Sequence, residues 1–127
     1  MIVDALGNPL DFRLTAGQVS DISAAKELLL SAGVEKKYVL ADKGYDCDAL
    51  IEAILLHGGK AVIPWRSNRR ESPTNRECDW HLYKERHLVE CQINKMKHFR
   101  RISTRYEKLA SSFLAMLYIV GTLIWLR

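Results

Sequence analysis

A phenol, two cations and a carboxylate recur at helical spacing in the C-terminal half of the chain. They form the pattern Y-x2-R-x3-E-x6-K, which in chain order is Tyr83, Arg86, Glu90 and Lys97. At about 100° per residue, steps of three, four and seven residues return to one face of a helix. A carboxylate can hold a divalent cation, and arginine and lysine can grip phosphate. Gathered on one face, these groups would suit phosphoryl chemistry on a nucleic acid.

The same spacing also fits an ordinary solvent-exposed helix face. Arg86 and Glu90 are separated by four positions, which is the separation of a common helical ion pair. Ion pairs of this kind occur on many helices without any further role. The spacing alone therefore leaves a solvated face and a functional face both open.

A second acidic residue, Asp42, directly follows a short apolar run at 38–41. Sites in α/β domains gather at the carboxyl ends of strands, and Gly44 would permit a tight turn or a close ligand approach. Asp42 and Glu90 would together suit Mg²⁺, which often needs only one or two carboxylates plus substrate phosphate. Alternatively, Asp42 caps a turn and Asp46 caps the following helix.

Composition indicates one folded domain, or part of one, with a polyanion as a candidate partner. The chain has 127 residues, and 48% of them are hydrophobic, which is enough for a core. The net charge is +4 and is unevenly spread, at −4 over residues 1–59 and +8 over residues 60–127. A basic half favours nucleic acid as a partner, although an ordinary basic surface would have a similar composition.

The cysteines and the N-terminal residues favour a cytoplasmic location. Cys47, Cys78 and Cys91 form no even disulfide framework, which fits a reducing compartment. The first residues contain no basic segment followed by a long apolar run, so they do not resemble a signal peptide.

Alternating strand and helix patterns would position the candidate groups. A Gly-Asn-Pro turn at 7–9 joins two short strands, and Ser20 or Asp21 would cap a first helix that Gly33 ends. The expected elements are strands at 2–6 and 10–14, a helix to about 31, a strand at 38–41, a helix at 47–57 and a strand at 60–65. The second helix should turn Leu50, Ile51, Ile54 and Leu55 inward. This order predicts an α/β domain containing a βαβ-like unit.

The motif helix is expected to run unbroken from about Trp80 to Arg101. Its core stripe should consist of Leu82, Val89, Ile93 and Met96. The motif face lies beside that stripe, so its groups would be partly buried and held in place. The polar loop before the helix has four arginines that would contact phosphates or simply solvate the loop, namely Arg66, Arg69, Arg70 and Arg76.

Together the two motifs resemble bacterial insertion-sequence transposases of the DDE type, in the group named after insertion sequences four and five. That family carries D-x-G-[FY] around its second catalytic acid, which Asp42-Lys43-Gly44-Tyr45 matches. It carries Y-x2-R-x3-E-x6-K around the third acid, which this chain matches at all four positions. Segments 3–9, 14–18 and 105–110 are also similar to the family, so the resemblance covers essentially the whole chain.

The resemblance implies an incomplete RNase H-like, or retroviral-integrase-like, α/β domain: a β-hairpin, then α-β-α-β and two C-terminal helices. It implies DNA cleavage at transposon ends and strand transfer with two Mg²⁺ or Mn²⁺ ions. Asp42 and Glu90 would be the catalytic metal ligands, while Tyr83, Arg86 and Lys97 would contact DNA. The implied partners are double-stranded transposon ends and target DNA, at the bacterial nucleoid.

The family uses three acids, and the first lies on a strand ahead of the hairpin. Residues 1–127 are therefore expected to be the C-terminal portion of a catalytic domain, without the first acidic strand or the N-terminal DNA-binding region. Asp4, in the hairpin, is a poor substitute. The fragment alone is expected to be inactive, and to self-associate or join an upstream transposase fragment. The alternative is a catalytically dead DNA-binding or inhibitory fragment.

Two further hypotheses concern a membrane and zinc. Residues 109–126 are 18 uncharged residues, the threshold length for a membrane-spanning helix, but their polar members favour a buried helix and no membrane partner. Cys78 and His81, with His87 and Cys91, offer four zinc ligands. Only five residues separate the two pairs, fewer than in zinc fingers.

Overall fold

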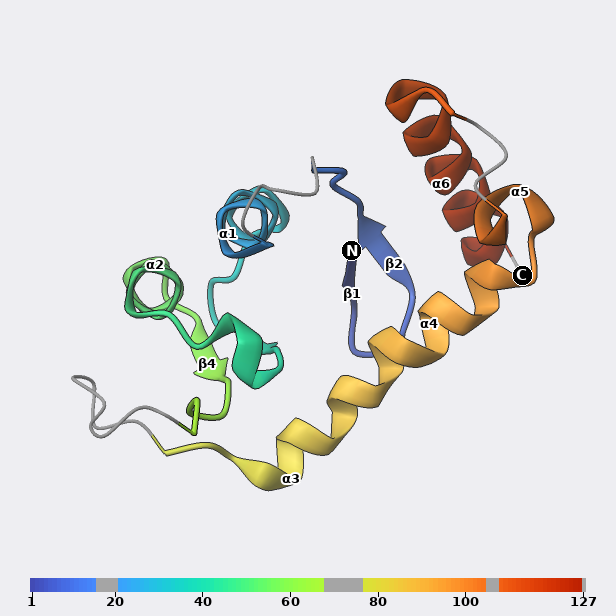
Figure 1. Cartoon of the computed structure of the whole chain (residues 1–127). Helices are drawn as coiled ribbons and strands as arrows, with labels where there is room; N and C mark the ends of the chain where they lie inside the picture. The colour runs from blue at the N-terminus through green and yellow to red at the C-terminus, as the bar shows by residue number, and fades with distance from the viewer. Residues whose placement is uncertain (16–20, 68–76, 105–107, 127) are drawn as a thin grey trace. The chain divides into compact units, whose positions relative to one another are not determined.

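The computed structural model describes residues 1–15, 21–67, 77–104 and 108–126 of the chain. Arg69, Arg70, Arg76 and the candidate cap Ser20 lie outside these described residues. The chain divides into two compact units (Figure 1). The central unit is Gln18–Arg86, and the terminal unit combines Met1–Gly17 with His87–Arg127.

The central unit contains the βαβ arrangement that the sequence predicts. Strands β3 and β4 pair in parallel, with Val39 opposite Ala61, and α2 connects them. The elements are α1 (Asp21–Ala32), β3 (Tyr38–Leu40), the 3₁₀ turn η1 (Lys43–Tyr45), α2 (Asp48–Leu56), β4 (Lys60–Val62), α3 (Trp80–Tyr83) and the 3₁₀ turn η2 (Lys84–Arg86). Helices α1 and α2 lie side by side in Figure 1.

Aliphatic side chains from successive elements form the core of the central unit. Its buried members are Val34, Val39, Leu50, Ile51, Ile54 and Ile63. Leu55 is half exposed, at 50%, so its expected inward position is wrong. Leu50, Ile51 and Ile54 lie within about 100° around α2, and Leu55 falls beyond the edge of that stripe.

The terminal unit joins a short hairpin to the C-terminal helices. Strands β1 (Ile2–Val3) and β2 (Pro9–Asp11) pair antiparallel, which confirms the hairpin but in shorter strands than expected. Pro9 begins β2 instead of belonging to the turn. The helices are α4 (His87–Lys97), α5 (Arg100–Ser103) and α6 (Ala110–Trp125).

Asp4 holds the hairpin turn through local hydrogen bonds. Its Oδ1 atom accepts from the backbone N–H groups of Leu6, at 2.8 Å, and Asn8, at 2.9 Å. Gly7 adopts a φ of +84°, which a residue with a side chain rarely does. Burial alone would raise the pKa of Asp4, but the hydrogen bonds from Asn8, Leu6 and Gly7 outweigh it and lower the pKa. Asp4 therefore has a structural role in the turn.

Helix α6 packs on the hairpin around the buried residues Phe12, Met96 and Val120. The Tyr118 ring meets Phe12 edge-on at a centroid distance of 5.4 Å, and its hydroxyl donates to the Asp11 carboxylate. The indole N–H of Trp125 donates to the Pro9 carbonyl at 2.6 Å. Within the described segments, no helix combines the length and the apolar character needed to cross a bilayer.

The motif helix is not continuous, contrary to expectation. The segment is divided into α3, η2, α4 and α5, and Phe99 breaks it with an extended backbone at φ −85° and ψ 111°. This break lets both Phe99 and Ile102 pack against the core of the terminal unit. A 3₁₀ turn advances about 120° per residue, whereas an α-helix advances about 100°. Side-chain directions calculated for one continuous helix from Trp80 are therefore wrong beyond Lys84.

The expected core stripe is correspondingly wrong at one position. Met96 is buried, but Ile93 is 40% exposed, and Gln92 is buried at 1% exposed. In α4 the inward positions follow four-residue steps through Leu88, Gln92 and Met96. Neither polar atom of the Gln92 amide has a hydrogen-bond partner among the described residues.

Candidate functional site

Asp42 lies where β3 ends and caps the 3₁₀ turn η1. Its Oδ1 atom accepts from the Gly44 N–H at 2.8 Å, which confirms that the residue caps a turn. The side chain is exposed. A carboxylate has two oxygens with about four acceptor positions, so one capping hydrogen bond leaves capacity for a cation. The capping hydrogen bond fixes the direction of the carboxylate and leaves acceptor positions on its oxygens.

Gly44 is tightly confined against Asp42. A Cβ atom at position 44 would lie 2.8 Å from Asp42 Oδ1, closer than real Cβ contacts come. Any side chain there would push the carboxylate out of its present position. The expected tight turn at Gly44 is therefore confirmed. Glycine is required there because the Asp42 carboxylate leaves no room for a side chain.

Arg66, four residues beyond the end of β4, fastens the same turn. Its Nη2 atom donates to the Gly44 carbonyl at 2.6 Å, and its Nε atom donates to the Lys43 carbonyl at 3.3 Å. The backbone N–H of Arg66 donates to Oδ2 of the buried Asp46 at 2.9 Å. Arg66 is thus a clamp on the Asp42 turn and does more than solvate the loop, while its contact with phosphate remains a prediction.

Asp46 and Tyr45 anchor the end of the turn. Cys47, not Asp46, occupies the N-cap position of α2 and makes no side-chain cap, so the expected capping role of Asp46 is wrong. Tyr45 packs against the central core. Burial first, and then the charges of Asp21 and Asp42, raise the pKa of Tyr45. The phenol therefore stays neutral, and the loop is pinned at both ends.

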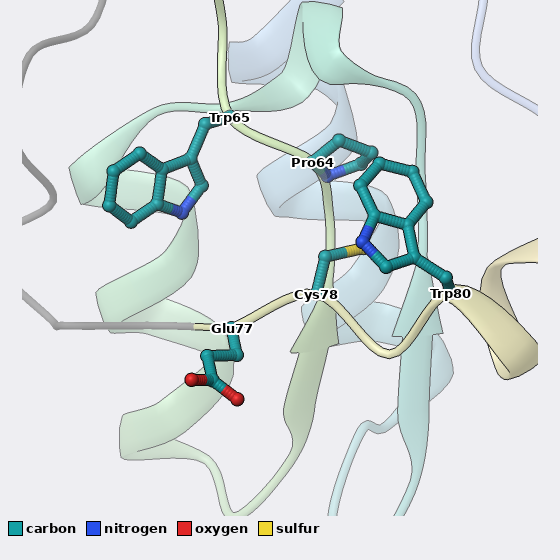
Figure 2. Close-up of a pocket in the computed structure, with 5 residues that line it drawn as sticks. All are labelled: Pro64, Trp65, Glu77, Cys78 and Trp80. Atoms are coloured by element: carbon teal, nitrogen blue, oxygen red, sulfur yellow. The ribbon is translucent and has the colours of Figure 1, made fainter.

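A pocket of about 790 Å³ opens beside Asp42 within the central unit. Its lining residues are Asp42, Lys43, Gly44, Pro64, Arg66, Ser67, Trp80 and Tyr83. A smaller pocket of about 450 Å³ shares Pro64 and Trp80. In Figure 2, Pro64, Cys78 and Trp80 lie on one side of the smaller pocket, and Trp65 and Glu77 lie on the other.

Tyr83 and Arg86 are close together at the end of the central unit. The Arg86 guanidinium carbon lies 5.6 Å from the centroid of the Tyr83 ring, within cation–π range. Tyr83 meets the Trp80 ring edge-on at 5.5 Å. Asp79 caps α3 by accepting from the N–H groups of His81 and Leu82, both at 3.1 Å. This cap fixes the start of the short helix that carries both aromatic rings.

Glu90 and Lys97 are both exposed on α4 in the terminal unit, so the expected partial burial of these two motif groups is wrong. Seven residues apart, they share one face of the helix. Glu90 lies in the first turn and Lys97 in the last, where each charge also favours the helix dipole. The structure therefore groups Asp42, Tyr83 and Arg86 in one unit and Glu90 with Lys97 in the other. The convergence of all five remains a prediction.

Comparison with known proteins decides the family. The family model described as "Transposase DDE domain" matches residues 1–125. The chain belongs to the DDE transposase family. It is 40% identical over 129 residues to "Putative transposase for insertion sequence element IS6501" of Brucella ovis, covering 99% of this chain and 95% of that protein. No solved structure matches the chain.

DDE transposase domains act on DNA and use divalent metal ions. The donor chemistry of this domain fits such an ion, because Asp42 offers exposed carboxylate oxygen directly after a strand. Within the described stretches, no three His, Cys, Asp or Glu side chains gather closely enough to hold a metal.

Two features of the surroundings of Asp42 were not identified from the sequence. Trp80 lies three residues before Tyr83, and that helical spacing could have placed both rings on one face. The Arg66 clamp spans 23 positions to Lys43, and no local pattern announces it.

Proposed function

We propose that this chain is part of the catalytic domain of an insertion-sequence transposase, acting in DNA cleavage at transposon ends and in strand transfer. The observation that carries the proposal is the presentation of Asp42. The acid is exposed and caps the turn that follows β3, and Arg66 bonds to the carbonyl of the neighbouring Gly44. The domains of this family use divalent metal ions.

In this proposal Asp42 and Glu90 are metal ligands in an RNase H-like domain, and the metal is Mg²⁺ or Mn²⁺. Bound divalent ions activate an attacking oxygen and stabilise the leaving oxygen during phosphoryl transfer. Carboxylates are the hard oxygen donors that such ions take. Arg66 and Gly44 then act as positioning residues, because they hold the turn that aims Asp42.

Tyr83, Arg86 and Lys97 are proposed to contact DNA. Arginine and lysine bind phosphate through charge-assisted hydrogen bonds, and an aromatic ring can stack on a base. The partner would be double-stranded DNA at the transposon ends and target. Two ends must be brought together for transposition, so we also propose self-association or assembly with an upstream transposase fragment. The place of action would be the bacterial nucleoid.

The decisive experiment is metal-dependent cleavage of labelled transposon-end DNA. The chain is joined to an upstream segment that supplies the family's first acid. Asp42→Asn and Glu90→Gln should each reduce cleavage at least about 100-fold, because each removes a charged metal ligand. Binding to the same DNA should change by less than about threefold, since neither acid neutralises phosphate.

Matched controls are available at exposed acids elsewhere in the domain. Glu52→Gln on α2 and Glu85→Gln on η2 remove the same charge from exposed positions. Both should leave cleavage unchanged. Full activity in Asp42→Asn or Glu90→Gln would refute the assigned ligand roles.

A separate measurement tests the DNA contact at the end of α4. Lys97→Ala should weaken DNA binding and reduce the slope of log K against log salt by about one, as expected for one lost phosphate contact. Lys26→Ala, an exposed lysine on α1, serves as the control and should leave the slope unchanged. Equal slopes in the two variants would remove Lys97 from the interface.

The alternative function is DNA binding without chemistry, as an inhibitory fragment. Salt-dependent end binding, combined with no cleavage when the first acid is supplied, would favour that alternative. That result would support the proposed DNA contacts and refute the metal-ligand roles.

A further inference from the structure

Three exposed lysines lie on the two loops of the central unit that lead into β3 and β4. Lys36 and Lys37 belong to the loop at 33–37, and Lys60 follows the loop at 57–59 as the first residue of β4. Because the two strands are parallel, both loops reach the same edge of the sheet. Lys36, Lys37 and Lys60 form a lysine platform at that edge.

Backbone hydrogen bonds join the two loops of the lysine platform. The N–H of Lys36 donates to the Gly58 carbonyl at 2.9 Å, and the N–H of Lys60 donates to the Lys37 carbonyl at 2.9 Å. Each bond connects one loop directly to the other. The backbone that carries the three lysines is therefore held in a fixed arrangement, although the loops are distant in sequence.

The positive charges of the lysine platform are not neutralised by carboxylates of the described chain. The Lys37 ammonium donates to the Gly33 carbonyl at 3.2 Å, and the Lys60 ammonium lies 5.5 Å from the centroid of the Tyr38 ring. Among the described residues, no ion pair involves Lys36, Lys37 or Lys60. Like charges gathered on one surface repel one another, and an anion bound between them removes that repulsion.

Lys36 has an unfavourable backbone conformation on this platform. Its φ is +58°, and among the described residues it is the single non-glycine residue with a positive φ. This left-handed conformation disfavours a residue with a Cβ atom, and glycine adopts it readily. Structure alone would favour glycine at position 36, so the lysine there indicates a use for its charge.

A DNA phosphate backbone is the ligand that this surface fits best. A duplex presents closely and regularly spaced anions along a rod, and lysines neutralise them without reading the base sequence. Neither of the two pockets described above is lined by a platform lysine. An open, rigid, cationic surface suits a long polyanion better than a small molecule.

The lysine platform and Asp42 lie at opposite ends of β3. Lys37 directly precedes the strand, and Asp42 follows its last residue by two positions. The starts and the ends of parallel strands form opposite edges of a sheet, which face away from each other. We propose that the lysine platform binds the phosphate backbone of a second DNA duplex, separate from the duplex whose phosphate lies at Asp42. The inference rests on the proposed function and extends it by assigning a surface to DNA held away from the acid.

A bridging measurement tests whether the chain holds two duplexes. A short blunt duplex is immobilised, the full 127-residue chain is added, and capture of a fluorescent duplex of unrelated sequence is recorded. The wild type should capture the second duplex. A variant combining Lys36→Gly, Lys37→Gln and Lys60→Gln should capture it at least about tenfold less, because three phosphate contacts are lost. The immobilised duplex should still retain this variant, since the proposed contact at Lys97 is unchanged.

Single variants assign the loss to individual charges. Lys60→Gln should reduce the slope of log K against log salt by about one. The matched control is Lys26→Gln, at an exposed lysine of the same unit, which should leave both slope and capture unchanged. Glu35→Gln removes the acid that the two loops contain and should raise duplex affinity about two- to threefold. Lys36→Gly should weaken duplex binding without lowering the melting temperature, because glycine tolerates the positive φ.

Several results would overturn the lysine platform. They are unchanged capture in the triple variant, which would indicate bridging by self-association, or an equal loss in Lys26→Gln. A labelled polyglutamate peptide whose binding depends on the platform, while duplex binding does not, would assign the surface to an acidic protein instead. A wild type that binds one duplex and captures no second one refutes the platform alone. A wild type with no salt-dependent duplex binding refutes the proposed DNA function as well.

Discussion

The central and terminal units are stabilised in different ways. The core cluster of the central unit has six buried aliphatic side chains among its described residues, and all come from one continuous stretch of chain. The described part of the terminal unit has three buried hydrophobic residues in its core, Phe12, Met96 and Val120, drawn from the two ends of the chain. It also buries the unpartnered Gln92 amide and leaves Ile119 and Leu123 of α6 about half exposed.

This difference follows from the sequence separation of the contacts. In the central unit, strand, helix and strand are consecutive, so short connections close the core. In the terminal unit, the Trp125–Pro9 hydrogen bond joins residues 116 positions apart, and Tyr118 reaches Asp11 across 107. Distant contacts require a larger loss of chain entropy before they form. The stability of the central unit therefore depends on apolar packing among many side chains. The stability of the terminal unit depends more on individual contacts.

The largest expected effect tests the packing of the central unit. Ile54→Ala removes a side chain that is 1% exposed and should lower the free energy of unfolding by about 2–5 kcal/mol. Urea denaturation followed by circular dichroism measures it. The adjacent Leu55→Ala, at a half-exposed position, should lower it by much less. Equal losses at the two positions would mean that α2 does not bury the face described above.

The next effect tests the close approach of α6 to the hairpin. A Cβ at Gly121 would lie 3.2 Å from the Phe12 ring, so Gly121→Val should destabilise the chain by about 1–3 kcal/mol through overpacking. Thermal unfolding provides the measurement. Ala115→Val, at an exposed position of the same helix, shows the intrinsic effect of a β-branched residue. If both variants lose the same stability, the close approach of Gly121 to Phe12 does not contribute to the stability of the chain.

A third substitution should make the terminal unit more like the central unit. Gln92→Met keeps a similar straight side chain and removes a buried amide without partners, so stability should rise by about 1–3 kcal/mol. Asn94→Met, at an exposed position of α4, should change stability by less than about 0.5 kcal/mol. A destabilised Gln92→Met chain in urea denaturation would show that the amide has a required partner.

The smallest effect concerns pH and the hairpin turn. The folded-state pKa of Asp4 lies below the ordinary value of 3.8, so its stabilising contribution is fully present above about pH 4 and is lost as pH falls through the folded pKa. Asp4→Ala should remove about 1 kcal/mol at pH 6, and the difference from wild type should shrink at pH 2.5. Asp4→Asn cannot titrate, so its stability should not show this pH dependence. A pH-independent difference between wild type and Asp4→Ala would exclude the carboxylate form as the stabilising species.

Sequence patterns were sufficient where structure depends on neighbours. The hairpin, α1 ending near Gly33, and the parallel β3–β4 pair all follow from turn residues and periodicity. The same reasoning failed along residues 80–103, because a 3₁₀ turn and the break at Phe99 reset the helical phase. As a result Gln92 is buried in place of Ile93, and a hydrophobic pattern would not predict a buried glutamine.

The sequence by itself determined the family and the candidate acids, because the residue spacing around Asp42 and Glu90 can be recognised without any tertiary contact. The tertiary structure decided how the Asp42 turn is held, because Arg66, in the segment after β4, bonds to the turn that follows the parallel strand β3. It also decided that Trp80 stands uncovered beside that acid. Both features depend on contacts between residues more than twenty positions apart, which only the folded chain brings together.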